Sequence, residues 1–242
     1  MQAICLLFLC DNEGIENSAI ISFVRFPYYC IVLCLKESEI NMIPKIIHYC
    51  WFGKGEKSER AKLCYESWKK YAPDWKIIEW NEDNFDVNQV KWTQGAYENK
   101  KWAFVTDYVR LYALYNFGGV YMDTDVELYK PIDEFLDNEG FTGFEAVNYC
   151  ATATLGAVRE NPLIRKMMSI YENMDFVLYD DWRKYIANER TSVCIESNVL
   201  GYAGIDRTQD KEQKIEHFTV YPSSYFHTKN EGYAYHSWEG SW

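Results

Sequence analysis

The segment from Trp102 to Leu128 constrains the fold of this 242-residue chain more than any other part. It reads WAFVTDYVRLYALYNFGGVYMDTDVEL, an amphipathic stretch that ends at a glycine pair, then a short apolar run, then two aspartates around one threonine. This pattern predicts a helix followed by a buried strand. The carboxylates of Asp123 and Asp125 would then lie just past the strand, where such groups hold a divalent cation against phosphates.

Strand-like and helical patterns alternate from residue 43 onward. We expect strands at 43–50, 75–80, 120–122 and 126–129, and helices at 59–71, 84–100, 102–117 and 162–174. Beyond residue 140 the pattern is mixed, with strand-like runs at 141–146 and 151–158 and loop-rich, aromatic sequence after 174. This alternation predicts an α/β fold with a mainly parallel sheet covered by helices on both faces. Ligands bind such sheets at the carboxyl ends of the strands, where the Asp-Thr-Asp turn falls.

The first 41 residues differ from the remainder. Their apolar runs, at 3–10 and 20–35, fall short of the roughly 20 apolar residues that a membrane-spanning helix needs, because Arg25 and Pro27 interrupt the second. No basic segment precedes the first run, as a signal peptide would require. We therefore expect an atypical extension at 1–41, weakly structured or not native, with a membrane-associating segment as the alternative. One domain would occupy 42–242.

Charge and cysteine usage narrow the class of protein. The net charge of −11 argues against a nucleic-acid partner, since binding a phosphate backbone needs a basic surface. An acidic protein that binds an anionic nucleotide needs a local cation. The eight cysteines show no CxxC spacing, which indicates reduced, buried thiols in a cytoplasmic protein.

Three segments carry a family resemblance: IPKIIHYCWFG at 43–53, TDYVRLYALYNFGGVYMDTDVEL at 106–128, and YHSWEGSW at 235–242. Together they resemble the DXD-containing glycosyltransferases that share a sugar-binding region. That family includes bacterial capsule and lipopolysaccharide enzymes, yeast initiating mannosyltransferases and clostridial glucosylating toxins. The resemblance covers about residues 43–242. It implies a GT-A fold, which is a single Rossmann-like domain with the DXD turn at a strand end, a nucleotide-sugar donor, Mn²⁺ or Mg²⁺, and transfer with retention.

The resemblance also implies roles for individual residues. Trp51 would stack on the nucleotide base, and Asp107 with Arg110 would grip the donor sugar. Asp123 would contact ribose or sugar hydroxyls and reach the metal through water, whereas Asp125 would bind the metal directly.

The end of the chain would complete this site, with His236, Ser241 and Trp242 contributing to the diphosphate and His236 also to the metal. Structural interpretations remain open beside these roles. Trp51 could be a core aromatic, His236 an ordinary loop residue, and Asp107 with Arg110 an ion pair on an exposed helix face, since the pair lies off the aromatic stripe. A Ca²⁺-binding EF-hand is excluded, because its sixth loop position must be glycine.

The sequence thus predicts a metal-dependent retaining hexosyltransferase with a UDP- or GDP-linked donor and a glycan or lipid-linked glycan acceptor. Capsule, lipopolysaccharide or other bacterial surface-polysaccharide synthesis is the expected setting, in the cytoplasm and peripherally at the inner face of the membrane. The motif carboxylates are committed to metal and donor, so we expect same-face attack instead of a covalent intermediate. The alternatives are a non-catalytic glycan- or metal-binding module, and a nucleotidyltransferase, which lacks support because no Gly-rich, Lys-bearing phosphate loop is present.

Overall fold

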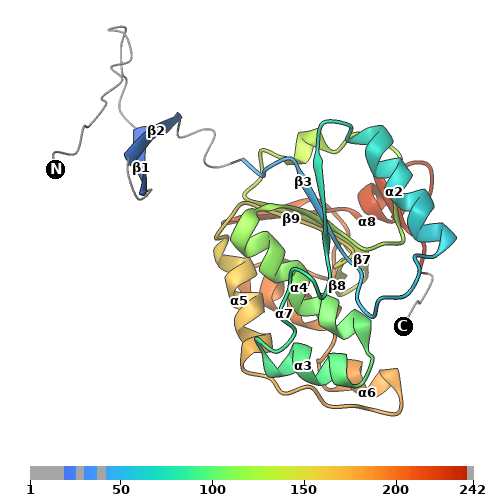
Figure 1. The fold of residues 1–242 in the computed structure, drawn as a ribbon. Coiled ribbons are helices and arrows are strands. Elements are labelled where there is room, and N and C mark those ends of the chain that lie inside the picture. Colours follow the sequence, from blue (N-terminus) through green and yellow to red (C-terminus); the bar gives the residue numbers. More distant parts are fainter. Residues whose placement is uncertain (1–18, 26–29, 37–41, 239–242) are drawn as a thin grey trace, which may run out of the picture. The chain divides into compact units, whose positions relative to one another are not determined.

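The structure, a computed structural model, describes residues 19–25, 30–36 and 42–238. The chain divides into two compact units, residues 1–42 and 43–242. In the first unit, strands β1 (Ala19–Arg25) and β2 (Cys30–Lys36) pair in antiparallel fashion. The second unit is the α/β body drawn in Figure 1, and it contains the candidate site.

The described residues of the second unit, 43–238, form ten strands: β3 (Ile46–Cys50), β4 (Lys76–Trp80), β5 (Gly119–Met122), β6 (Val126–Leu128), β7 (Gly140–Ala146), β8 (Tyr149–Cys150), β9 (Thr154–Ala157), β10 (Gln213–Ile215), β11 (Phe218–Tyr221) and β12 (Ala234–His236). Eight of them form one sheet in the order β10-β11-β7-β9-β5-β3-β4, with β8 beside β7, while β12 pairs with β6. Strands β4, β3, β5, β7 and β11 run in one direction, and β9 is inserted antiparallel between β5 and β7. The predicted mainly parallel sheet is confirmed, as a mixed one.

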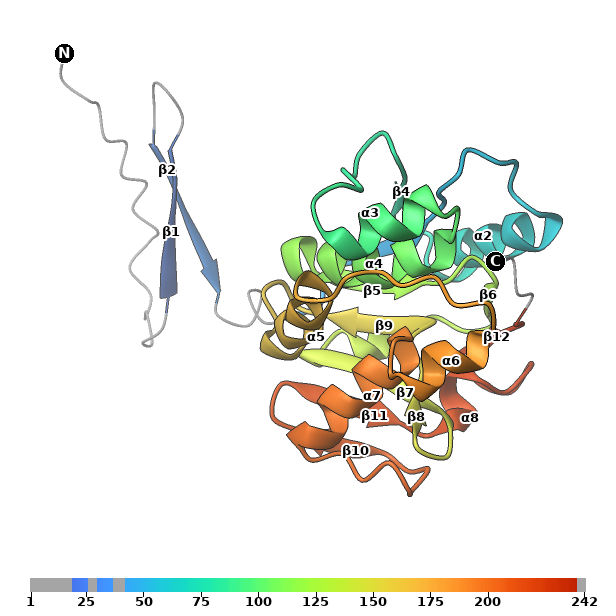
Figure 2. The same cartoon turned by 90° about the horizontal axis from the view of Figure 1, so that it is seen from below.

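Helices cover both faces of this sheet (Figure 2). They are α2 (Glu59–Tyr71), α3 (Lys91–Glu98), α4 (Trp102–Phe117), α5 (Pro162–Glu172), α6 (Trp182–Ala187), α7 (Ser192–Ala203) and α8 (Ser223–Phe226), with a short 3-10 turn at Asp133–Phe135. Helices α4, α5 and α7 lie on one side of the sheet, and α2 and α8 lie on the other (Figure 1 and Figure 2). Alternate residues of β5 enter different cores: Tyr121 joins the one built with α4, α5 and α7, whereas Val120 and Met122 join the one built with α2 and α8. This alternation follows from the two-residue period of a strand.

One predicted helix was too long, because the helix expected at 84–100 begins only at Lys91. The preceding loop satisfies its backbone with short polar side chains instead. The Asp83 N–H donates to Asn81 Oδ1 at 2.9 Å, and the Asn88 N–H donates to Asp86 Oδ1 at 3.0 Å. Asn and Asp side chains compete in this way with the hydrogen bonds of a helix. Residues 84–90 therefore form a loop instead of the first turns of the helix.

Two glycines carry the chain from α4 into β5. Gly118 has φ +64° and Gly119 φ +114°, a backbone region that L side chains rarely adopt. A Cβ at Gly119 would also lie 2.6 Å from the Ile46 carbonyl oxygen. The glycine pair therefore ends the helix and lets β5 run directly beside β3.

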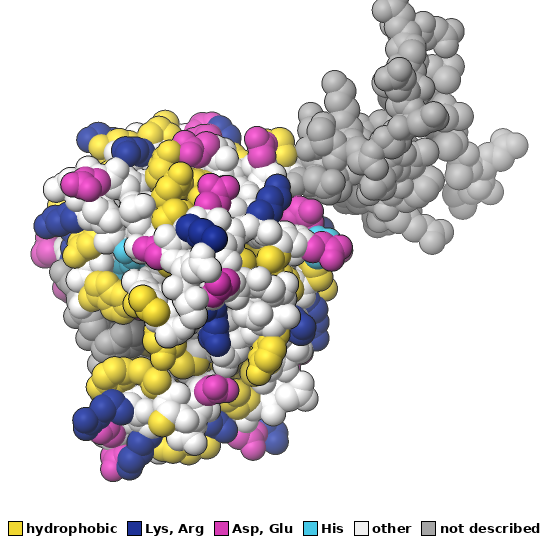
Figure 3. All heavy atoms as spheres, turned by 180° about the vertical axis from the view of Figure 1, so that it is seen from behind, with side chains coloured by type: hydrophobic (Ala, Val, Ile, Leu, Met, Phe, Trp, Pro, Cys, Tyr) yellow, Lys and Arg dark blue, Asp and Glu magenta, His cyan; other side chains and the backbone are white. Residues whose placement is uncertain are grey.

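Two global properties follow from the described residues. Among them, no helix is long and apolar enough to cross a membrane. On the face drawn in Figure 3, acidic and basic side chains are intermixed, so the net charge of −11 is not gathered there into a single acidic region.

Candidate active site at the carboxyl end of the sheet

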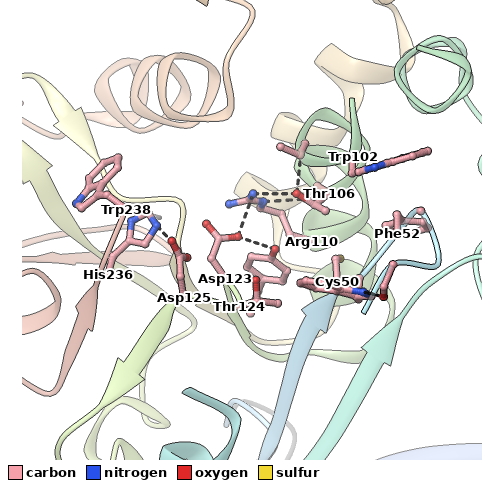
Figure 4. A pocket seen from close by; sticks show the side chains of 15 residues that line it. Cys50, Phe52, Trp102, Thr106, Arg110, Asp123, Thr124, Asp125, His236 and Trp238 are labelled. Carbon is pink, nitrogen blue, oxygen red and sulfur yellow. Dashed lines mark hydrogen bonds and ion pairs between the residues drawn. The ribbon is translucent and has the colours of Figure 1, made fainter. Parts of the chain in front are cut away.

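A cavity of about 280 Å³ opens where β3 and β5 end (Figure 4). Strands β4 and β5 flank β3 on opposite sides, so the chain reverses its direction of winding at this point. Such a switch point leaves a crevice at the carboxyl ends of the strands, which is where α/β proteins bind ligands. The cavity is lined from three distant segments: 50–55, 102–125 and 236–238.

Asp123, Asp125 and His236 meet in this cavity. Each offers one ligand atom, and these atoms all lie within 4.8 Å of one another. His236 Nε2 lies 3.1 Å from Asp125 Oδ1, and the Tyr121 hydroxyl donates to Asp123 Oδ1 at 2.7 Å. Carboxylate and imidazole ligands suit Mn²⁺-type ions, so the residues present fit the cation that the resemblance implies.

The third ligand is delivered by strand pairing. β12 runs antiparallel to β6, with His236 opposite Val126. The Ser237 N–H and its hydroxyl both donate to the Asp125 carbonyl oxygen at 3.1 Å. The C-terminal segment is thereby fastened to the Asp-Thr-Asp turn itself.

The carboxylates around His236 favour a positive charge at this place. Burial lowers its pKa, but the hydrogen bond with Asp125 and the negative charges around it prevail and raise the pKa overall. Its Nδ1 is buried and has no hydrogen-bond partner among the described residues. Metal-bound histidines usually present the second ring nitrogen to a partner of their own.

Arg110 lies beside the aspartates and is buried, as is Asp107. Arg110 Nη1 donates to the Thr152 carbonyl oxygen at 2.7 Å, while Nη2 lies 3.3 Å from Asp107 Oδ1 and 3.4 Å from Asp123 Oδ1. The guanidinium also stacks on Tyr121 at 4.6 Å from the ring centroid. The interpretation of Asp107 and Arg110 as an ion pair on an exposed helix face is wrong, because their side chains are only 9% and 4% exposed.

Burial governs the carboxyl groups around Arg110. It raises the pKa of Asp107 to about 6 although Arg110 opposes the shift, and it raises that of Glu145 to about 7. Glu196, whose Oε1 has no partner among the described residues, has its pKa raised by burial to about 8. Glu145 and Glu196 therefore retain protons in part near neutral pH, and neither residue lines the cavity.

Trp51 lines the cavity and also packs against the core on the α2 face. Its position is therefore compatible both with stacking on a nucleotide base and with the role of a core aromatic. Its Nε1 donates to the Gly55 carbonyl oxygen at 2.7 Å, which holds the indole against the loop after β3. Trp102 stands close by, since a Cβ at Gly53 would meet its ring at 2.5 Å. The cavity thus has an aromatic end.

Some lining residues escaped the sequence analysis. Trp102 and Thr106 lie eight and four residues before the predicted Arg110, so they share its face of α4, and that spacing was available as a signal. Trp238, two residues after His236, also lines the cavity. Ser241 and Trp242, which were predicted to contact the diphosphate, lie outside the described residues.

The cysteines of the α/β body behave as predicted. Cys50, Cys64, Cys150 and Cys194 are buried, and Cys50, Cys150 and Cys194 are free thiols. Burial raises the pKa of the Cys150 thiol to about 12, so this group is inert at neutral pH.

Comparison with known proteins finds similarity to glycosyltransferases. The family model described as the glycosyltransferase sugar-binding region containing a DXD motif matches residues 58–142. Inositol phosphoceramide mannosyltransferase 1 of Schizosaccharomyces pombe is 31% identical over 111 residues, which cover 43% of this chain and 34% of that protein. Mannosyl phosphorylinositol ceramide synthase SUR1 of Saccharomyces cerevisiae is 24% identical over 183 residues, covering 64% of this chain and 46% of that protein. The matches therefore span less than half the length of either relative.

A solved structure, the PaToxG glycosyltransferase, is similar to this chain with a TM-score of 0.50 at 16% identity. The likeness covers 67% of this chain and 69% of that one. At this identity it bears on the fold alone, and it confirms the GT-A fold.

Proposed function

We propose that the chain is a metal-dependent, retaining hexosyltransferase, on the premise that residues 58–142 match the glycosyltransferase sugar-binding region containing a DXD motif. The observation that carries the proposal is the convergence of Asp123, Asp125 and His236 beside buried Arg110 in one cavity at the strand ends. The donor is a UDP- or GDP-linked hexose. Because the two relatives are named as an inositol phosphoceramide mannosyltransferase and a mannosyl phosphorylinositol ceramide synthase, GDP-mannose is the first donor to test.

Asp125, Asp123 and His236 would hold Mn²⁺ or Mg²⁺, which when bound neutralises the charge that develops on the leaving diphosphate. Arg110 adds a fixed positive charge at the same place. Its contact with Thr152 and its stacking on Tyr121 hold the guanidinium in position before any substrate arrives. The Tyr121 hydroxyl fixes the rotamer of Asp123.

Arg110 and Asp107 are well placed for the donor hexose. A carboxylate accepts hydrogen bonds from hydroxyls, and Asp107 lies within 3.3 Å of the guanidinium that faces Asp123. With these carboxylates engaged, the acceptor hydroxyl attacks from the face that the diphosphate leaves. Its proton passes to a diphosphate oxygen as the new glycosidic bond forms, so the configuration is retained.

The acceptor is a glycan or a lipid-linked glycan. Surface-polysaccharide synthesis, at the inner face of the cytoplasmic membrane, is the setting we propose. The ceramide substrates in the names of the two yeast relatives support a lipid-linked acceptor as the first class to screen.

Substitution of Asp125 by Asn tests the proposal. We expect wild-type protein with Mn²⁺ to release nucleoside diphosphate from a donor in a panel that includes GDP-mannose and UDP-glucose, and EDTA to stop the release. Asp125→Asn should lower the rate at least about 100-fold, because metal affinity and charge neutralisation are both lost. Circular dichroism should show an unchanged fold.

Asp137→Asn is the matched control, since Asp137 is exposed and does not line the cavity. Full activity of Asp125→Asn, or of the wild type in excess EDTA, would contradict the proposal. Donor binding without turnover in the wild type would instead support a non-catalytic glycan- or metal-binding module.

A further inference from the structure

We propose that Trp238 is a stacking platform for a pyranose ring of the acceptor, an inference that rests on the proposed function. The indole is 55% exposed although it lines the cavity. Aromatic rings present a flat apolar face, and the C–H face of a hexose fits such a surface at the end of the cavity where Asp125 and His236 also lie.

The backbone at Trp238 supports a functional role. Its φ of +56° is in the left-handed region, which is unusual for a bulky residue. Such conformations persist only where the surroundings enforce them, and they cluster at ligand sites. Here the enforcing contacts come from Ser237, which is bound to the Asp125 carbonyl oxygen and also accepts from Arg60 Nε at 3.0 Å.

Neighbouring rings hold the indole in place. The Trp238 ring lies on His236 with centroids 4.4 Å apart and an interplanar angle of 30°. The His227 ring is a second neighbour, with its centroid 6.4 Å from the centroid of the Trp238 ring. The indole is therefore oriented in advance and still keeps more than half of its surface open. A rigid aromatic of this kind binds with little further loss of side-chain entropy.

The position of Trp238 favours the acceptor over the donor. In Figure 4, Trp238 and His236 lie at one end of the cavity, Trp102 and Phe52 at the other, and Asp123 and Arg110 between them. A donor whose base occupies the aromatic end near Trp102 places its diphosphate at the aspartates. Its hexose is then engaged by Arg110 and Asp107. The surface beyond His236 is left for the molecule that receives the hexose.

The test uses saturation-transfer NMR on the full chain with Mn²⁺ and GDP. The probes are methyl α-D-mannopyranoside, methyl β-D-glucopyranoside and methyl β-D-galactopyranoside. We expect at least one probe to receive saturation from the wild type. For that probe, Trp238→Ala should raise Kd about ten-fold, and Trp238→Phe should restore most of the affinity. Trp182→Ala is the control, because Trp182 is 67% exposed but does not line the cavity.

Donor hydrolysis is measured in parallel, and it separates this inference from the proposed function. Trp182→Ala should hydrolyse a donor with a KM within about two-fold of the wild type, and Trp238→Ala should raise the donor KM by less than it raises the Kd of the probe. If no probe depends on Trp238, or if donor KM rises as much as probe Kd, the acceptor platform is overturned while hydrolysis by the wild type still supports the transferase. Absence of metal-dependent hydrolysis in the wild type would overturn the proposed function.

Discussion

Asp107 and Arg110 show how much burial changes the chemistry of a familiar pair. On an exposed helix face, an ion pair three residues apart contributes a few tenths of a kcal/mol. Here the same pair is buried, and Arg110 is shared with Asp123. Burying a charge costs free energy unless its partners compensate, and the raised pKa of Asp107 shows that compensation is incomplete. The buried pair therefore lowers the free energy of unfolding, while its charged side chains are already in place to bind a ligand.

The pKa of Asp107 predicts opposite effects of one substitution on stability and activity. Its folded-state value of about 6 exceeds the ordinary 3.8, so the native state retains a proton that the unfolded chain loses between these pH values. Wild-type stability therefore falls as pH rises through this window. Asp107→Asn cannot titrate, so it should be more stable than the wild type at pH 7, by up to about 3 kcal/mol, with little difference at pH 4.

Activity should respond in the other direction. An ionised Asp107 accepts hydrogen bonds from the donor hexose, so transfer by the wild type should rise with pH through about 6, and Asp107→Asn should lose at least about ten-fold in kcat/KM. Urea unfolding at pH 4 and pH 7 and a pH–rate profile measure both effects. A variant that is less stable than the wild type at pH 7 would show that pairing with Arg110 outweighs burial.

At the scale of elements, the sequence predicted those helices whose ends are marked locally. α2 and α4 occupy the predicted ranges, 59–71 and 102–117. Ser58 caps the first by accepting from the Ala61 N–H at 3.1 Å, and Gly118 ends the second. The helix predicted at 84–100 begins only at Lys91, because short polar side chains bind the backbone of the preceding loop.

The glycine pair after α4 supports a prediction of its own. Gly119→Ala should destabilise the protein by more than about 1 kcal/mol, because φ is +114° and the new Cβ would lie 2.6 Å from the Ile46 carbonyl oxygen. Denaturant unfolding measures the loss. Gly55→Ala is the matched control, since a Cβ there meets nothing within 4 Å and φ is not positive. Equal stability of the two variants would show that β5 can shift away from β3 at no cost.

At the scale of the whole molecule, the site is a product of tertiary structure. The Asp-Thr-Asp turn, its strand and its α/β setting follow from local pattern, so they could be predicted. The arrival of His236 beside Asp125 depends on the pairing of β12 with β6, and no periodicity records a contact between residues so distant in sequence. Only the family resemblance suggested it. Trp238 was missed although it follows His236 by two residues, because only the pairing of β12 with β6 brings this segment to the cavity.

This long-range assembly couples ligand binding to the stability of the C-terminal segment. The Ser237 N–H donates to the Asp125 carbonyl oxygen across 112 residues, so its hydrogen exchange reports whether β12 stays docked. Mn²⁺ with GDP, if held by Asp123, Asp125 and His236, should slow exchange at Ser237 about 100-fold when the ligand is at 100 times its Kd.

Two comparisons make that measurement decisive. His236→Ala should remove most of the protection at Ser237, because the cation would no longer bridge β12 and the Asp-Thr-Asp turn. The Ala72 N–H, bonded to the Trp68 carbonyl oxygen at the end of α2, lies outside the lining of the cavity and serves as the internal reference. If the ligand slows exchange equally at both amides, it stabilises the molecule only globally. If it raises the melting temperature while exchange at Ser237 stays unchanged, the ligand is bound elsewhere and His236 is not one of its ligands.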